Sequence, residues 1–98
     1  MSEHIRVVAR FAARPDRVED VKRILSEMVG PTRREYGCIT YELLQNAGDP
    51  TDFTFVEEWT SKPALDEHAR SPHIQTGRAA LEGLLQRDAE IAVYNLVI

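Results

Sequence analysis

The sequence lacks the features that tie a chain to a membrane, a nucleic acid or a tightly held nucleotide. No stretch approaches the roughly 20 apolar residues of a membrane-spanning helix. Lys and Arg number 12 against 16 Asp and Glu, so the formal net charge is -4 and a basic surface for a phosphate backbone is missing. A glycine-rich phosphate loop is missing too. We therefore expect no membrane and no nucleic acid among its partners.

Cysteine and histidine are scarce as well. Cys38 is the one cysteine, so no disulfide can form within the chain, and we expect a reducing, cytoplasmic setting. The three histidines, His4, His68 and His73, form no HxH or HExxH pattern, so the sequence predicts no metal site. With 98 residues, 43% of them hydrophobic, the chain is expected to fold as a single domain over residues 1–98.

Four segments have the β-branched and aromatic content, or the alternation, that is typical of strands. The stretch from Asn46 to Pro50 has the composition of a turn and lies between two of them, which predicts an antiparallel hairpin. Side chains two apart on a strand share a face, which places Ile39, Tyr41 and Leu43 together. The predicted strands are His4 to Ala13, Cys38 to Gln45, Asp52 to Thr60 and Asp88 to Ile98.

The first helical stretch follows the first strand. Pro15 and Asp16 suit a helix start, and apolar residues then recur at helical spacing. Gly30-Pro31 is expected to break or kink this helix. A polar turn from Thr32 to Tyr36 follows, and Gly37 is suited to end it in the left-handed conformation.

The second helical stretch follows the third strand. Ser61 caps a helix predicted from Lys62 to about Arg70, and Ser71-Pro72 starts another that runs toward Leu85. The element order is therefore β-α-β-β-α-β. This order predicts an α+β fold of the ferredoxin-like type, with an antiparallel sheet and helices on one face.

Some strands are apolar on both faces. Val8 lies opposite Val7 and Ala9, and Leu44 lies opposite Leu43. Strands that are apolar on both sides need cover on both sides, but the helices can cover only one. We therefore expect the other face of the sheet to pack against a second copy, which gives a two-fold symmetric homodimer.

One carboxylate, one indole and one imidazole are predicted to converge between a strand and the helix after it. Glu57 and Trp59 share a strand face, and His68 lies on the same helical stripe as Leu65. Such a group is either a packed core with polar anchors or the wall of a reactive cavity. A carboxylate facing inward there is costly unless it is paired. Its expected partner is His68 or an arginine of the first strand, Arg6 or Arg10.

Several motifs together resemble the antibiotic biosynthesis monooxygenase (ABM) domain family of the dimeric α+β barrel superfamily. They are ARPDRVEDV from Ala13, TRREYGCITYELLQN from Thr32, FTFVEEW from Phe53 and ALDEHARSPHIQ from Ala64. The likeness covers essentially the whole chain, and it is nearest to the quinol monooxygenase-like branch. It implies a compact dimer with a ligand cavity between each sheet and its own helices. Family members include cofactor-independent monooxygenases that form quinones, haem-degrading enzymes and isomerases.

Oxygenation without a cofactor needs an electron-rich substrate, a dry cavity and a base. His68 is the natural base, although a histidine satisfied at a helix–sheet contact is an equal alternative. Glu57 is expected to manage protons with it. Trp59 offers a flat wall for an aromatic ring, and it is also a large core residue. The other substrate-binding candidates are Tyr41, Phe55 and Arg33.

The sequence thus predicts a cofactor-independent monooxygenase that oxidises a small aromatic quinol or polyphenol with O2. Two alternatives remain open at this point. One is an isomerase that enolises a small keto compound with the same histidine and carboxylate. The other is a non-catalytic ligand-binding dimer.

Overall fold

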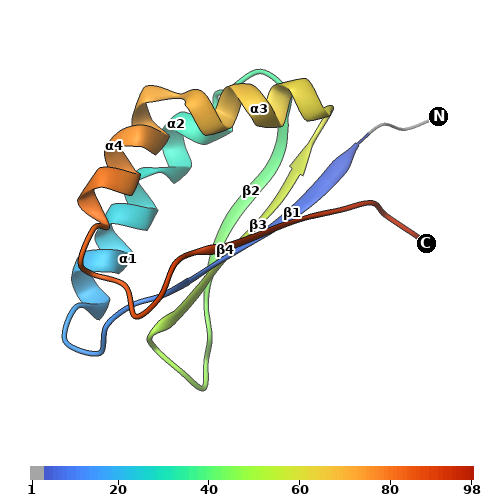
Figure 1. Cartoon of the computed structure of the whole chain (residues 1–98). Coiled ribbons are helices and arrows are strands. Elements are labelled where there is room, and N and C mark those ends of the chain that lie inside the picture. The colour runs from blue at the N-terminus through green and yellow to red at the C-terminus, as the bar shows by residue number, and fades with distance from the viewer. Residues whose placement is uncertain (1–3) are drawn as a thin grey trace.

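The computed structural model describes residues 4–98 and places its helices on one face of an antiparallel sheet (Figure 1). Residues 1–3 of the predicted 1–98 domain lie outside the described residues. The strands follow the order β2-β3-β1-β4 across the sheet. The predicted α+β fold and its β-α-β-β-α-β order are confirmed, with each helical part divided into two. The elements are β1 (Ile5–Ala12), α1 (Val18–Glu27), α2 (Val29–Arg33), β2 (Cys38–Gln45), β3 (Asp52–Trp59), α3 (Lys62–Arg70), α4 (Pro72–Ala80) and β4 (Glu90–Tyr94).

The helices begin and end close to the residues that the sequence indicates, with two corrections. The first helical stretch divides at Met28 rather than at Gly30-Pro31, because proline is tolerated in the first turn of a helix and both residues lie inside α2. The helix that starts at Pro72 ends at Ala80 rather than running to Leu85, which instead forms an isolated bridge with Ala13. None of the helices in residues 4–98 is both long and apolar enough to cross a membrane.

The strands also depart from the predicted pattern at two places. The register of β2 against β3 shifts between Cys38 and Thr40, which leaves Ile39 as an extra residue that is 45% exposed. The regular alternation predicted over Ile39 and Tyr41 is therefore interrupted. The last strand covers only Glu90–Tyr94, so the prediction that it continues to Ile98 is wrong.

The two faces of the sheet differ in character. The inner face, toward the helices, is packed: Phe53, Phe55 and Trp59 of β3 are each at most 1% exposed. The outer face carries ion pairs between β1 and β3, of which Arg6 with Glu58 is one, at 3.5 Å. No helix within residues 4–98 covers the outer face (Figure 1). The carboxylate that β3 turns inward, Glu57, therefore lies on the same side of the sheet as the helices.

Candidate active site

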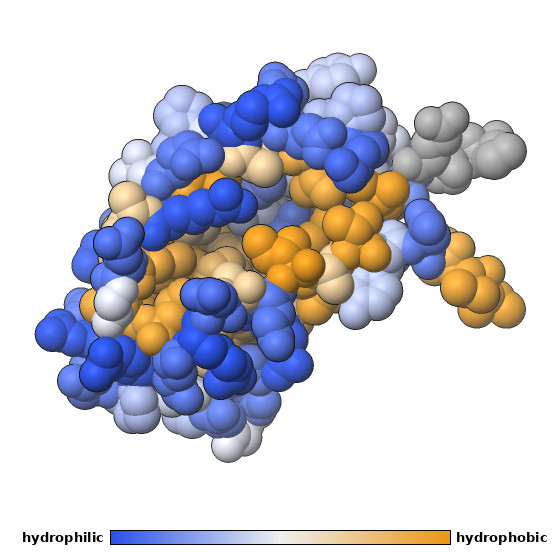
Figure 2. Space-filling model, viewed as in Figure 1, coloured by the Kyte–Doolittle hydropathy of each residue, from blue (hydrophilic) through white to orange (hydrophobic). Residues whose placement is uncertain are grey.

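A cavity of about 740 Å³ lies between the inner face of the sheet and the helices α3 and α4. Figure 2 shows it as a hollow in which apolar side chains gather, with hydrophilic side chains around its mouth. This is the size of site that encloses a small organic molecule. Its apolar wall includes Val7, Ala9, Phe11, Phe55, Leu65, Ile74 and Leu81, and its polar or titratable residues include Tyr41, Glu57, His68 and Arg78.

Glu57 presents a carboxylate to this cavity from the inner face of β3. Its side chain is 7% exposed, and its Oε1 accepts a 2.9 Å hydrogen bond from Nε1 of Trp59. Burial raises the pKa of Glu57 to about 7, and the bond from Trp59 opposes that rise. Glu57 is therefore close to half-protonated near neutral pH, which suits a group that gives and takes protons.

The prediction that Glu57 pairs with His68 or with an arginine of the first strand is wrong. Neither His68 nor an arginine bonds to it, because Arg6 and Arg10 point to the outer face and pair there with Glu58 and Asp52. The indole two residues along the same strand face supplies the donor instead. Trp59 is completely buried and is not one of the cavity-lining residues, so it supports the carboxylate from behind.

His68 is held by a residue that the sequence did not suggest. Its Nδ1 lies 2.9 Å from Oε2 of Glu35, in the turn between α2 and β2. A carboxylate can only accept, so Nδ1 carries the proton. Burial lowers the pKa of His68 below its ordinary 6.5 and outweighs the opposing bond and charge of Glu35, so the ring is neutral near pH 7.

A neutral ring that donates through Nδ1 leaves a lone pair on Nε2 of His68. This nitrogen has no hydrogen-bond partner among residues 4–98. Every side-chain nitrogen or oxygen in that range that is shielded from solvent does have a partner. Nε2 must therefore be reachable by solvent, and His68 is a lining residue of the cavity. The arrangement is that of a base presented to a cavity and oriented from behind by a carboxylate.

His73 joins the same cluster. Its Nε2 lies 2.7 Å from the same Oε2 of Glu35 and 3.1 Å from Oγ1 of Thr32. Glu35, His68 and His73 place one ligand-type atom each within 4.8 Å of one another. The expectation of no metal site was based on the absence of a local histidine motif. Such a motif cannot detect this cluster, because its three residues come from separate segments of the chain.

Tyr41 and Phe55, two of the substrate-binding candidates, line the cavity. Their rings stack with centroids 4.6 Å apart, and the ring of Tyr41 meets that of His68 edge-on at 5.4 Å. Burial raises the pKa of Tyr41 above its ordinary 10, and the negative charge of Glu57 adds a smaller rise. The phenol therefore remains a protonated donor.

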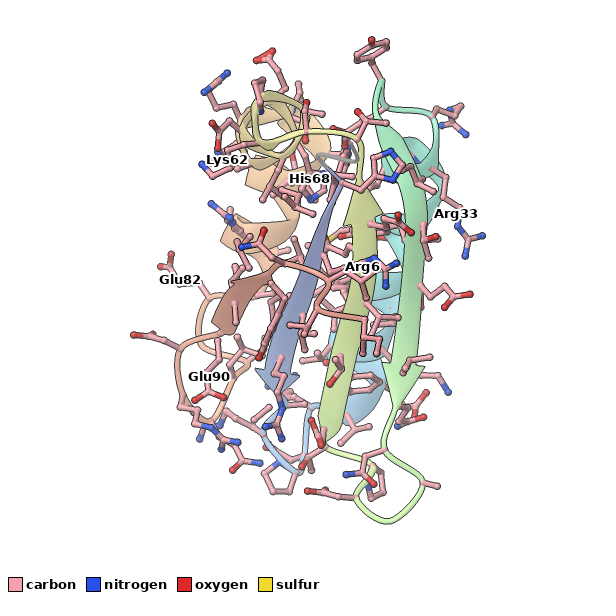
Figure 3. The ribbon with its side chains drawn as sticks, turned by 90° about the vertical axis from the view of Figure 1, so that its right-hand side faces the viewer. Arg6, Arg33, Lys62, His68, Glu82 and Glu90 are labelled. Carbon is pink, nitrogen blue, oxygen red and sulfur yellow. The ribbon has the colours of Figure 1, made fainter. Side chains whose placement is uncertain are left out.

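Arg33 is not brought to the cavity. Its Nε donates a 3.0 Å bond to the carbonyl oxygen of Tyr41, and Figure 3 shows it beside β2, away from His68 beneath α3. Arg78 of α4 lines the cavity instead, and no carboxylate in residues 4–98 forms an ion pair with it. The sequence offered no reason to select Arg78 among 12 basic residues.

Gly37 brings the turn of Glu35 close to α3. Its φ of +86° is one that side chains rarely adopt, as predicted for a left-handed stop. A Cβ at this position would lie 2.6 Å from Cβ of Ala64 in α3. The Gly37 carbonyl also accepts a 2.8 Å bond from the Thr60 amide, just before that helix. The absence of a side chain here therefore allows the approach that joins Glu35 to His68.

The fold is α+β, and its cavity is lined by a buried carboxylate, Glu57, and a buried imidazole, His68. The family model for antibiotic biosynthesis monooxygenases matches residues 4–80, and the chain belongs to this family.

Individual relatives agree with this assignment. Rv0793 of Mycobacterium tuberculosis, which bears the name "Putative monooxygenase", is 39% identical over 93 residues, or 95% of this chain and 91% of that protein. Its solved structure has a TM-score of 0.91 at 36% identity and covers 97% of this chain and 96% of its own. The structure of PA3566 from Pseudomonas aeruginosa has a TM-score of 0.93 at 31% identity, with 100% and 98% covered.

Proposed function

We propose that the protein is a cofactor-independent monooxygenase that oxidises a small aromatic quinol or polyphenol with O2. The observation that carries the proposal is the neutral, Glu35-oriented His68, whose Nε2 faces an apolar cavity shared with Glu57. Membership of the family supports an oxygenation reaction. The aromatic lining formed by Tyr41 and Phe55 supports a flat, unsaturated substrate.

The proposed reaction begins with proton transfer from a substrate hydroxyl to Nε2 of His68. The resulting phenolate is electron-rich, so it passes an electron to O2, and the two radicals combine to form a carbon–oxygen bond. Protonated Glu57 gives its proton to the terminal peroxide oxygen, and the resulting carboxylate takes the ring proton from that carbon as the O–O bond breaks. One oxygen atom stays as the new carbonyl. The other leaves as hydroxide and takes the proton held by His68 to form water, so both residues return to their starting forms. The substrate supplies all the electrons in this sequence.

Tyr41 has a supporting part in this proposal. Its phenol stays protonated, so it can donate to the oxygen on which negative charge develops. Trp59 acts through Glu57 rather than on the substrate, because it is completely buried. Glu35 is likewise a positioning residue, since it touches His68 and does not line the cavity.

Oxygen uptake with menadiol or an anthrone, corrected for autoxidation, tests the proposal. We expect enzyme-dependent uptake, with one atom of ¹⁸O from ¹⁸O2 in the product. Replacement of His68 by Gln should lower kcat by about 100-fold or more, the usual contribution of a general base. His4→Gln, which changes an exposed histidine outside the cavity, should leave uptake unchanged. Full turnover by His68→Gln would remove the base from the mechanism.

An isomerase is the second candidate, because His68 and a carboxylate with a pKa of about 7 at one cavity also suit enolisation of a keto compound. Proton exchange into a keto substrate without O2 consumption would favour it. Absence of both reactions, together with ligand binding in the cavity, would favour a non-catalytic binding protein.

The proposed assembly is a homodimer formed through the outer face of the sheet. The centre of this face is apolar, because Val8 pairs with Val56 on one side and with Ala92 on the other. Leu44 and Tyr94 are about half exposed, at 49% and 52%. A second copy would bury these side chains.

A further inference from the structure

Three ligand-type side chains converge beside the cavity, and we propose that Glu35, His68 and His73 form a binding site for a divalent transition metal such as Zn²⁺. The Oε2 atom of Glu35 is 2.9 Å from Nδ1 of His68 and 2.7 Å from Nε2 of His73. All three donor atoms lie within 4.8 Å of one another. The segments that carry them, the turn after α2, α3 and the first turn of α4, meet at one end of the molecule (Figure 1).

The donor set has the chemistry of a transition-metal site. Two imidazoles and one carboxylate bind Zn²⁺ and similar ions, with water in the remaining position. Tetrahedral ligands about 2.1 Å from zinc are separated by about 3.4 Å. The two separations from Oε2 of Glu35 are shorter, because each is now spanned by a hydrogen. The ion would replace those two hydrogens, and Oε2 of Glu35 would move away from each nitrogen by about 0.5–0.7 Å. The two histidine nitrogens, which lie within 4.8 Å of each other, would take up the same tetrahedral spacing.

The location also suits an ion. The side chains of Glu35, His68 and His73 are 16%, 9% and 23% exposed, so the cluster is sheltered but can be reached. His73 lines a second cavity, of about 630 Å³, beside α1 and α4, which offers an entry path. No Lys or Arg in residues 4–98 forms an ion pair with Glu35, so no side-chain ammonium or guanidinium takes the place of the metal.

Occupation of this site would reverse the tautomer of His68. The metal would take the lone pair of Nδ1, so the single proton of the neutral ring would move to Nε2. The nitrogen that faces the cavity would then donate rather than accept and could no longer remove a proton. Metal binding should therefore inhibit turnover. This consequence rests on the proposed function, whereas the binding itself does not.

Titration of tag-free, chelator-treated protein with Zn²⁺, followed by calorimetry or by competition with a chromophoric chelator, tests the site. We expect one ion per chain. His73→Gln and Glu35→Gln should each weaken binding by more than about 100-fold, since even supporting residues around a metal contribute 10- to 100-fold. His4→Gln is the matched control and should bind as the wild type does. Circular dichroism confirms folding, and His73, the most exposed of the three, keeps the test available if Glu35→Gln is unstable.

Absence of stoichiometric binding to the wild type, or binding that survives both substitutions, would overturn the site. Nitrogen-15 NMR of the histidine rings gives a second readout, with the proton of His68 expected on Nδ1 without zinc and on Nε2 with it. A proton that stays on Nδ1 in the zinc-bound protein would also overturn the site. Zinc that binds and changes the tautomer without slowing quinol oxidation would overturn the assignment of His68 as base, and would leave the metal site in place.

Discussion

The indole of Trp59 donates a 2.9 Å hydrogen bond to Glu57, two residues earlier on the buried face of β3. This bond stabilises the carboxylate and so limits the rise in pKa that burial causes. Trp59→Phe removes the donor and keeps an aromatic ring, so we expect the pKa of Glu57 to increase further above about 7. The pKa of Glu57 is measured directly by following the carbon-13 NMR shift of its carboxyl carbon as the pH is varied.

Tyr41→Phe is the control for this substitution, because it alters a neighbouring aromatic residue that does not bond to Glu57. A pKa of Glu57 that falls or stays constant in Trp59→Phe would contradict the account. The alkaline limb of the pH–rate profile should shift in the same direction as the pKa if protonated Glu57 takes part in turnover.

Glu57 also makes folding stability depend on pH. Its folded pKa of about 7 lies above its ordinary 4.5, so the folded state holds the proton more tightly than the unfolded state. Its contribution is therefore fully present below pH 4.5 and is lost as the pH rises through 7. The loss is about 3 kcal/mol by linkage.

Glu57→Gln cannot titrate and should lose this slope. Urea unfolding at several pH values for both proteins measures the free energy of unfolding, and the difference between the two curves isolates Glu57. Subtraction matters because the lowered pKa of His68 acts in the opposite sense, adding stability as the pH rises. Parallel curves between pH 5 and 8 would show that Glu57 does not have a raised pKa.

Local periodicity was enough to predict which way Glu57, Trp59 and His68 point. Strand alternation places Glu57 and Trp59 on one buried face, and helical spacing turns His68 inward. These relationships extend over a few residues, so they follow from backbone geometry alone. The β-α-β-β-α-β order is equally local, because it depends on turn and cap signals between short periodic segments.

The partners of these residues could not be predicted in the same way. Glu35 and His68 are 33 positions apart, and Glu35 and His73 are 38 apart. Their meeting depends on how closely the turn after α2 approaches α3, which no short pattern encodes. Gly37 was the one available signal, since a left-handed glycine two residues after Glu35 marks a sharp change of direction.

Gly37→Ala tests that role. An alanine at φ +86° costs about 1–2 kcal/mol, and its Cβ would also press on Ala64 at 2.6 Å, so we expect a loss of about 2–4 kcal/mol in unfolding free energy. Gly48→Ala is the matched control in an open turn with no positive φ, and its effect should stay within about 0.5 kcal/mol. Equal effects of the two substitutions would show that Gly37 does not hold the turn against α3.

Arg78 and Arg33 provide a paired test of which arginine meets the substrate. Arg78 lines the cavity and Arg33 does not. With an anionic quinol, Arg78→Gln should raise KM by about fivefold, the value of a charge interaction of about 1 kcal/mol at an exposed site. Arg33→Gln should leave KM unchanged. The reverse result would place the substrate at the edge near β2 rather than in the cavity.

Val8 provides the test of the proposed dimer, because it lies at the centre of the apolar part of the outer face, between Val56 and Ala92. The wild type should have twice the chain mass of 11.1 kDa by light scattering at micromolar concentration. Val8→Asp would bury a carboxylate between two copies and should give the monomer mass. Gln75→Asp adds the same charge on exposed α4, on the other side of the molecule, and should leave the dimer intact. A wild type of 11.1 kDa would show that the outer face does not bind a second copy.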